Sequence, residues 1–108
     1  MPHDRTVPTP AQADVLRNML AAGDERIHRE AGGFWVTRLT QRRPERSDWW
    51  TWYAQINGIH AMEQRGWLVR VGGPGADDKA DRKLTDAGRA LAVRLMEEAV
   101  AAKQTTGG

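Results

Sequence analysis

Residues 62–70 read MEQRGWLVR, and residues 82–91 read RKLTDAGRAL. Apolar residues at helical spacing, Ile56, Ile59 and Met62, lead into the first stretch, where Gly66 is followed by the β-prone run of residues 67–71. Glycine is a common stop signal because it adopts the left-handed conformation that closes many helices. We therefore predict a helix that ends at Gly66 and turns directly into a strand.

The second stretch predicts a strand followed by a helix. Residues 72–80, GGPGADDKA, are turn-forming, and residues 81–84 can return as the partner of the preceding strand. Thr85 is a good N-cap, and the Ala- and Leu-rich sequence after it predicts a long helix from about residue 86 to 102. Together the two stretches predict a strand, a loop, a second strand and a long helix.

We expect the helix that ends at Gly66 to begin near residue 51, with Ser47 or Asp48 as its cap. One side of this helix is apolar and is expected to face the core; it consists of Trp52, Ile56, Ile59 and Met62. The other side is polar or short-chained and presents Tyr53, Asn57, Ala61 and Gln64, flanked by His60 and Arg65. This second side is therefore the one available to a partner.

The chain begins with the pattern of a capped helix. Thr9 is followed by Pro10, a favoured first helical residue, and by Gln12 at the third position, as in a capping box. Apolar residues then recur at helical spacing until Gly23. We predict a helix over residues 10–22.

A β-hairpin and a loop are expected next. Two β-prone runs flank a Gly-Gly pair, which supplies the positive φ that a tight turn needs, so residues 26–37 predict a hairpin. Residues 38–48 have no apolar period and contain Pro44, which opposes a long helix. They predict a basic loop.

The 108 residues allow one domain, which we place at residues 9–103 between disordered tails at 1–8 and 104–108. The sequence has no cysteine, which excludes disulfides, thiolate chemistry and Cys-based zinc sites. No segment is apolar enough for a signal peptide or a membrane span. We expect a soluble cytoplasmic protein with no membrane contact, associated with the nucleoid if it binds DNA.

The order of the predicted elements and the two stretches quoted first resemble winged-helix regulators of the MarR and PadR kind. Residues 62–70 are similar to the junction between the recognition helix and the wing in that family, and residues 82–91 to the exit from the wing into the final helix. The resemblance covers roughly residues 10–102. It implies an α+β, mostly α, winged helix with a two-stranded wing and a long C-terminal helix.

Two features depart from the family's pattern. The hairpin at 26–37 is an additional element in the N-terminal half. The usual second helix of the helix-turn-helix is missing or shortened, and the loop at 38–48 and the Trp-rich segment after it stand in its place.

The resemblance implies sequence-specific binding of duplex DNA by a transcriptional regulator of bacterial, phage or mobile-element origin, with the helix before Gly66 in the major groove. The candidates for reading bases are Tyr53, Asn57, His60, Gln64 and Arg65. The candidates for phosphate contacts are Arg38, Arg42, Arg43, Arg46, Arg70, Lys79 and Arg82.

The charge distribution leaves a second function open. Residues 37–70 carry six arginines against three acids, which favours phosphate binding. The predicted wing carries Asp77, Asp78 and Asp81, which would repel phosphate. The alternative is a winged helix that serves as a protein-interaction module, such as a phage inhibitor or an assembly subunit, without DNA binding.

Three of the five tryptophans, Trp35, Trp52 and Trp67, lie at positions expected to face the core, whereas Trp49 or Trp50 is expected to stay partly exposed. The three histidines are scattered, and no carboxylates are expected to face each other across a cleft. We therefore expect no enzymatic activity, metal or cofactor.

The C-terminal helix is longer than so small a domain can cover. Its apolar stripe is expected to pair with a second copy of the chain, and it contains Leu91, Leu95 and Ala99. The sequence thus predicts a homodimer that presents two recognition helices to a palindromic site.

Overall fold

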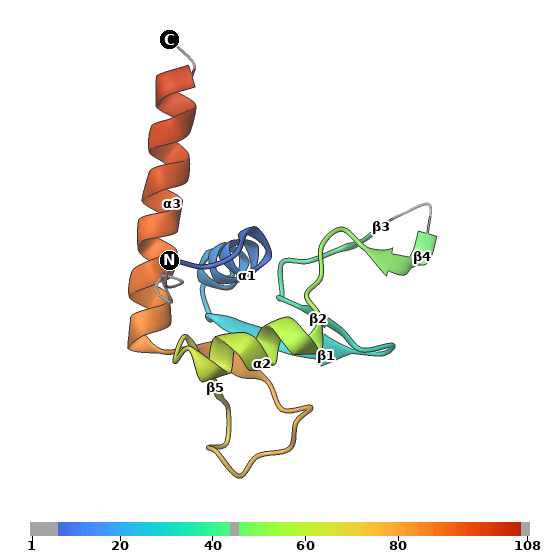
Figure 1. The fold of residues 1–108 in the computed structure, drawn as a ribbon. Helices are drawn as coiled ribbons and strands as arrows, with labels where there is room; N and C mark the ends of the chain where they lie inside the picture. Colours follow the sequence, from blue (N-terminus) through green and yellow to red (C-terminus); the bar gives the residue numbers. More distant parts are fainter. Residues whose placement is uncertain (1–6, 44–45, 107–108) are drawn as a thin grey trace.

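The computed structural model describes the backbone of residues 7–43 and 46–106, and the side chains of residues 7–42 and 50–102 (Figure 1). Within these residues it contains three helices and six strands. The helices are α1 (Pro10–Ala21), α2 (Ile56–Gln64) and α3 (Asp86–Thr106). The strands are β1 (Arg26–Glu30), β2 (Phe34–Val36), β3 (Arg42–Arg43), β4 (Arg46–Trp50), β5 (Leu68–Arg70) and β6 (Arg82–Leu84). The expected α+β class is confirmed.

Helix α1 begins at the predicted capping box. The Gln12 amide donates to the Thr9 hydroxyl at 3.2 Å, and the Thr9 amide donates to the Gln12 side chain at 2.9 Å. These bonds satisfy amides that would otherwise lack a partner at the start of the helix. Gly23, with φ +83°, follows the last turn as expected.

An antiparallel sheet joins the N-terminal hairpin to the second half of the chain. Its strand order is β2-β1-β6-β5. The hairpin of β1 and β2 is confirmed, and Gly32 and Gly33 in its turn have φ values of +91° and +84°. Strand β6 lies between β1 and β5, with Leu84 opposite Leu68 and Arg82 opposite Ile27. Of the two strands predicted after α2, β6 therefore lies inside this sheet and β5 forms one of its edges.

The segment before α2 differs from the prediction. Strands β3 and β4, at residues 42–43 and 46–50, pair antiparallel where a basic loop followed by a helix was expected. The backbone of Ala54 then exchanges hydrogen bonds of 2.8 and 3.0 Å with Trp35. This bridge holds the chain extended, so α2 begins at Ile56 rather than near residue 51. Its N-cap is Gln55, which makes no side-chain cap bond, rather than Ser47 or Asp48.

Helix α3 is longer than predicted. It begins after Thr85, whose hydroxyl accepts a hydrogen bond from the Gly88 amide at 3.0 Å, so the predicted cap is confirmed. It continues to Thr106, so residues 104–106, expected in a disordered tail, are helical. Its second half extends beyond the rest of the molecule (Figure 1). Of the other predicted tail residues, 7 and 8 lie outside any helix or strand, and 1–6 and 107–108 lie outside the described part of the chain.

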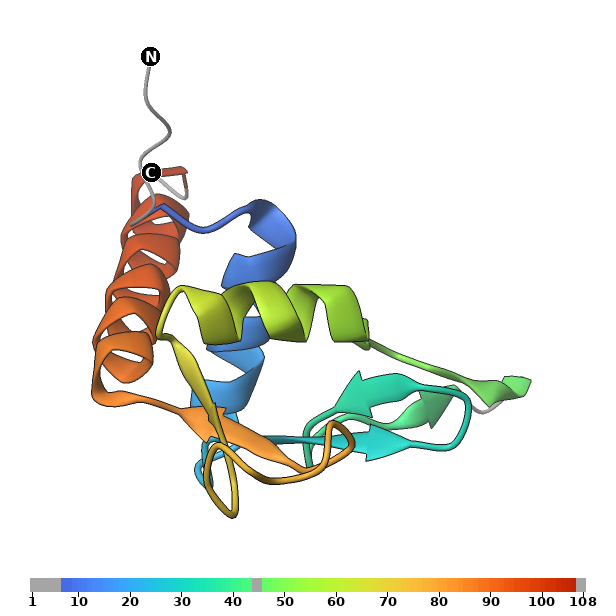
Figure 2. The same ribbon diagram turned by 60° about the horizontal axis from the view of Figure 1, so that its bottom comes forward.

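The core lies between the helices and the sheet. In Figure 2, α1 and α2 lie on the same side of the sheet, and α3 packs beside α1. Trp35 and Trp67 are buried in this core as predicted, and Trp52 is half-buried against it. Trp50 is half-buried as well, and the side chain of Trp49 lies outside the described residues.

Candidate nucleic-acid interface

Helix α2 has the two-sided character that its sequence predicted. Ile59 and Met62 are fully buried, whereas Asn57 and Gln64 are exposed. Asn57 and Gln64 are seven residues apart, which places them on the same side of the helix and about 10 Å apart along its axis. The amide-bearing side of α2 is therefore open to a partner.

Two other base-reading candidates have structural contacts. Tyr53 precedes α2 instead of lying on it, and its ring packs edge-on against Phe34, with centroids 4.9 Å apart. Arg65 lies just after α2; its guanidinium donates to the carbonyl of Val7 at 3.1 Å and lies over the ring of Trp67. Both residues lie outside α2, one before it and one after it.

His60, the remaining candidate on α2, is bound to the loop between β5 and β6 (residues 71–81, the β5–β6 loop). Its Nε2 lies 2.7 Å from Oδ1 of Asp78. The same oxygen accepts hydrogen bonds from Arg70 at 3.0 Å and Arg82 at 3.2 Å. One carboxylate of the loop thus joins α2, β5 and β6.

Glu63 forms the second half of this network. It accepts hydrogen bonds from Arg70 at 3.1 Å and from Arg82 at 3.2 Å. Burial raises the pKa of Glu63, but the hydrogen bonds and charges of the two arginines outweigh burial and hold the pKa below its usual value. The hydrogen bond from His60 likewise lowers the pKa of Asp78. Both carboxylates are therefore ionised at neutral pH.

Arg82 was predicted to contact phosphate, and this prediction is wrong. The side chain is 0% exposed and lies over the ring of Trp35 at 5.2 Å. It also donates to the carbonyls of Asp78 and Ala80. The physical reason is its strand position: Arg82 shares the inner face of β6 with Leu84, while Lys83 between them is exposed. Arg82 is a structural residue of the core.

The other predicted phosphate contacts are dispersed. Arg70 is only partly exposed, since it donates to Glu63, Asp78 and the carbonyl of Ala76. Arg38 is exposed, and its Nε donates to the carbonyl of Ala22 at the end of α1. Lys79 is exposed on the β5–β6 loop.

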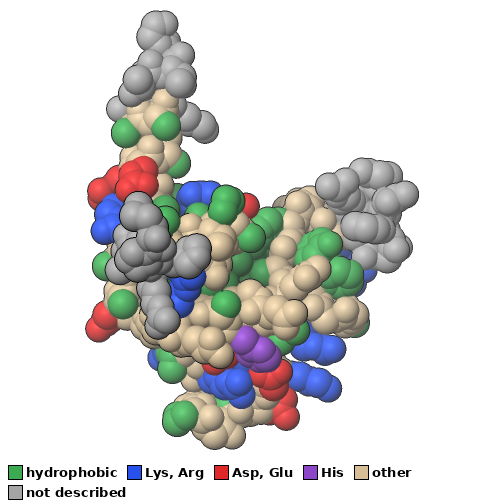
Figure 3. All heavy atoms as spheres, viewed as in Figure 1, with side chains coloured by type: hydrophobic (Ala, Val, Ile, Leu, Met, Phe, Trp, Pro, Cys, Tyr) green, Lys and Arg blue, Asp and Glu red, His purple; other side chains and the backbone are tan. Residues whose placement is uncertain are grey.

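The remaining three arginines lie on the β3–β4 hairpin, which is at the right of the molecule in Figure 1, away from the β5–β6 loop at the bottom. The guanidinium of Arg42 lies 4.8 Å from the centre of the Trp50 ring, and the side chains of Arg43 and Arg46 lie outside the described residues. In Figure 3, acidic and basic side chains are intermixed around the loop at the bottom of the molecule. The described residues thus do not form one continuous basic surface beside α2.

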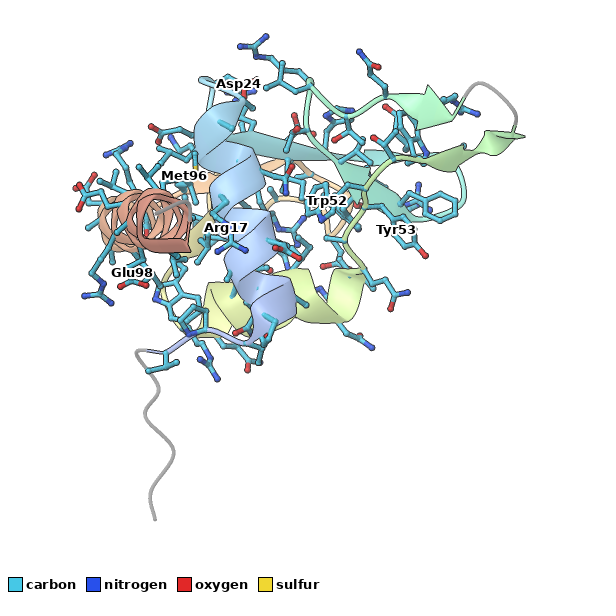
Figure 4. The ribbon with its side chains drawn as sticks, turned by 90° about the horizontal axis from the view of Figure 1, so that it is seen from above. Arg17, Asp24, Trp52, Tyr53, Met96 and Glu98 are labelled. Atoms are coloured by element: carbon cyan, nitrogen blue, oxygen red, sulfur yellow. The ribbon has the colours of Figure 1, made fainter. Side chains whose placement is uncertain are left out.

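Two hollows border α2. An open hollow of about 550 Å³ lies between α2 and the β5–β6 loop, and its lining is His60, Glu63, Gln64, Arg70 and Asp78. A groove of about 530 Å³ lies between α1 and the segment before α2, with Trp52 and Tyr53 in its wall. Trp52 lies closer to α1 than Tyr53 does (Figure 4). The sequence did not predict either hollow, because each depends on how distant segments pack.

The predicted dimer residues on α3 are only partly available. Leu91 is 7% exposed and belongs to the core, and Leu95 packs against the core. The prediction that Leu91 faces a second copy is therefore wrong, because it is buried in the core, whereas Leu95 is only partly buried. Ala99 is exposed. The larger exposed apolar side chains of this helix are Val93, Met96 and Val100.

Comparison with known proteins finds no matching family model, no similar curated protein and no similar solved structure. Among the described residues, none of the helices combines the length and the apolarity needed to cross a bilayer. In the same part of the chain, no three His, Cys, Asp or Glu side chains are grouped to hold a metal ion.

Proposed function

We propose that this chain is a winged-helix domain that binds duplex DNA with α2 in the major groove. The observation that carries the proposal is the orientation of α2, which buries Ile59 and Met62 and exposes Asn57 and Gln64. The major groove admits an α-helix, and Asn and Gln amides bond the N6 and N7 edge of adenine. The open side of α2 therefore offers the chemistry that direct base reading requires.

The topology around α2 supports the same proposal. The elements follow the winged-helix order of α1, the β1–β2 hairpin, α2, the antiparallel ribbon of β5 and β6, and α3, with β6 between β1 and β5. In this arrangement the β5–β6 loop is the wing and lies beside the presented helix. The β3–β4 hairpin occupies the place of the usual second helix, and its arginines would contact the DNA backbone.

The proposed DNA-binding unit is a homodimer formed through the exposed apolar side chains of α3. Val93, Met96 and Val100 are 40%, 36% and 54% exposed on a helix that extends beyond the domain. Two copies joined there would present two α2 helices, and dimeric winged helices read half-sites about one helical turn apart. The regulated genes would then carry a palindromic site.

One observation favours the alternative, a protein-interaction module. Glu63 and Asp78 neutralise Arg70 and Arg82, so the surface beside α2 has little net positive charge. The salt dependence of binding to random-sequence duplex DNA separates the two functions. A DNA-binding domain should lose affinity steeply as salt rises, with a slope of about −0.9 for each phosphate contact. Absence of binding at low salt would favour the protein-interaction function.

A further inference from the structure

The β5–β6 loop, the proposed wing, contains Asp78, whose carboxylate lies where an anionic ligand would bind. Oδ1 of Asp78 accepts from His60 at 2.7 Å, Arg70 at 3.0 Å and Arg82 at 3.2 Å. These donors come from α2, β5 and β6. Several nitrogen donors that converge on one oxygen form the arrangement that proteins use to bind carboxylate or phosphate oxygens.

The donors are also held by groups other than Asp78. Arg70 donates through Nε to Glu63 at 3.1 Å and through Nη1 to the carbonyl of Ala76 at 2.9 Å. Arg82 is fixed by burial, by Glu63 and by the ring of Trp35. The two guanidinium groups therefore have anchors that would remain if the Asp78 carboxylate left.

Asp78 itself lies at the surface, although its carboxylate accepts from these three donors. Its side chain is 53% exposed, and it belongs to a glycine-rich loop in which Gly72 and Gly73 have positive φ. The hollow between this loop and α2 opens beside His60 and Gln64. A change of the Asp78 side-chain rotamer would leave His60 and Arg70 facing that hollow.

We propose that the Asp78 carboxylate occupies a phosphate-binding site formed by His60 and Arg70, with buried Arg82 behind them, and that a DNA phosphate must displace it. This inference rests on the proposed DNA binding and adds its regulation: the wing competes with DNA for the cations beside α2. Glu63 remains in place and orients Arg70 toward the incoming phosphate.

Asp78→Asn and Asp77→Asn form a matched pair for the test. Both residues are exposed neighbours on the same loop, and each substitution removes one negative charge, but only Asp78 contacts the cations. We expect Asp78→Asn to strengthen binding to random duplex DNA at low salt roughly tenfold more than Asp77→Asn, because it removes a direct competitor of phosphate.

Adding His60→Gln to the Asp78→Asn variant should remove part of the increase in affinity, because one phosphate donor is lost. Equal effects of the two Asn variants, or weaker binding by Asp78→Asn, would show that Asp78 does not block the site. If wild type binds DNA in that case, this inference fails and the proposed function stands. If neither wild type nor any variant binds DNA, both fail.

A measurement on the wild-type protein covers the case in which Asp78→Asn does not fold. The side-chain carboxyl carbons of Asp77 and Asp78 are followed by ¹³C NMR while duplex DNA is added. Displacement predicts a large change at Asp78, a change at the His60 ring and little change at Asp77. An unchanged Asp78 signal in the DNA-bound protein would overturn the inference.

Discussion

Gly88, in the first turn of α3, lies directly against the carbonyl oxygen of Trp67. A Cβ at position 88 would be 2.1 Å from that oxygen and 3.0 Å from the carbonyl carbon. The same carbonyl accepts a hydrogen bond from the Thr85 amide at 3.0 Å. The start of α3 is therefore packed backbone to backbone against the residue that leads from α2 into β5, which requires glycine at this position.

Gly88→Ala should destabilise the protein by about 3 kcal/mol, because the obstacle is backbone and both segments would have to separate. Urea unfolding followed by circular dichroism measures the change. The matched control is Gly58→Ala in α2, where a Cβ meets nothing within 4 Å. Alanine there should be neutral or stabilise by up to about 1 kcal/mol. Equal effects of the two substitutions would contradict the close packing of α3 on Trp67.

Arg82→Met should also lower the free energy of unfolding, by about 3 kcal/mol, because Glu63 loses a buried partner and the methionine cannot donate to the loop carbonyls. Lys83→Met, on the exposed face of the same strand, should change it by less than about 0.5 kcal/mol. Unfolding curves of the two variants measure both changes and separate the effect of the buried arginine from that of its exposed neighbour. A stable Arg82→Met variant would mean that the arginine does not organise the wing.

Acid should weaken the fold through Glu63 and Asp78. The pKa of each carboxyl is lowered in the folded protein, so each stabilises the fold above its unfolded-state pKa, and this stabilisation is lost as pH falls through the folded-state pKa. The free energy of unfolding should therefore fall from about pH 5 downward. Glu63→Gln should reduce that fall, whereas Glu97→Gln, at an exposed position on α3, should leave it intact. A Glu63→Gln protein with the same pH profile as wild type would contradict this assignment.

The proposed dimer can be tested on the exposed second half of α3. Met96→Glu and Val100→Glu should shift the protein from dimer to monomer in sedimentation experiments, because they place charge in an apolar contact. Arg29→Glu, an exposed change in β1, is the control and should leave the dimer intact. A wild-type protein that is monomeric at high concentration would show that this helix does not join two copies.

The elements that depend on local sequence were predicted well. The capping box at Thr9, the Gly-Gly hairpin and the cap at Thr85 involve residues close in the chain, and the periodicity of α2 identified Ile59 and Met62 as buried. The β3–β4 hairpin was missed because residues 38–48 show no apolar period, and the late start of α2 was missed because the bridge from Ala54 to Trp35 depends on a distant partner. For such segments, local patterns carry little information.

The candidate site was predicted less completely than the fold. Arg82 could have been recognised as inward-facing, since it alternates with Leu84 on a strand, but its positive charge suggested a surface role. The contact of His60 with Asp78 joins residues 18 positions apart and depends on how the glycine-rich loop folds back. No periodicity specifies such a contact.

The proposed function depends most on whether the Asn57 and Gln64 side of α2 reads base edges. The direct test is selection from random duplex DNA, followed by affinity measurements with Asn57→Ala and, for comparison, Arg42→Gln. We expect Asn57→Ala to lose discrimination of about 1–3 kcal/mol at one base position while its affinity for random DNA is retained. Arg42→Gln should weaken binding to all sequences alike. No enriched sequence, or the same preference in wild type and Asn57→Ala, would contradict base reading by α2.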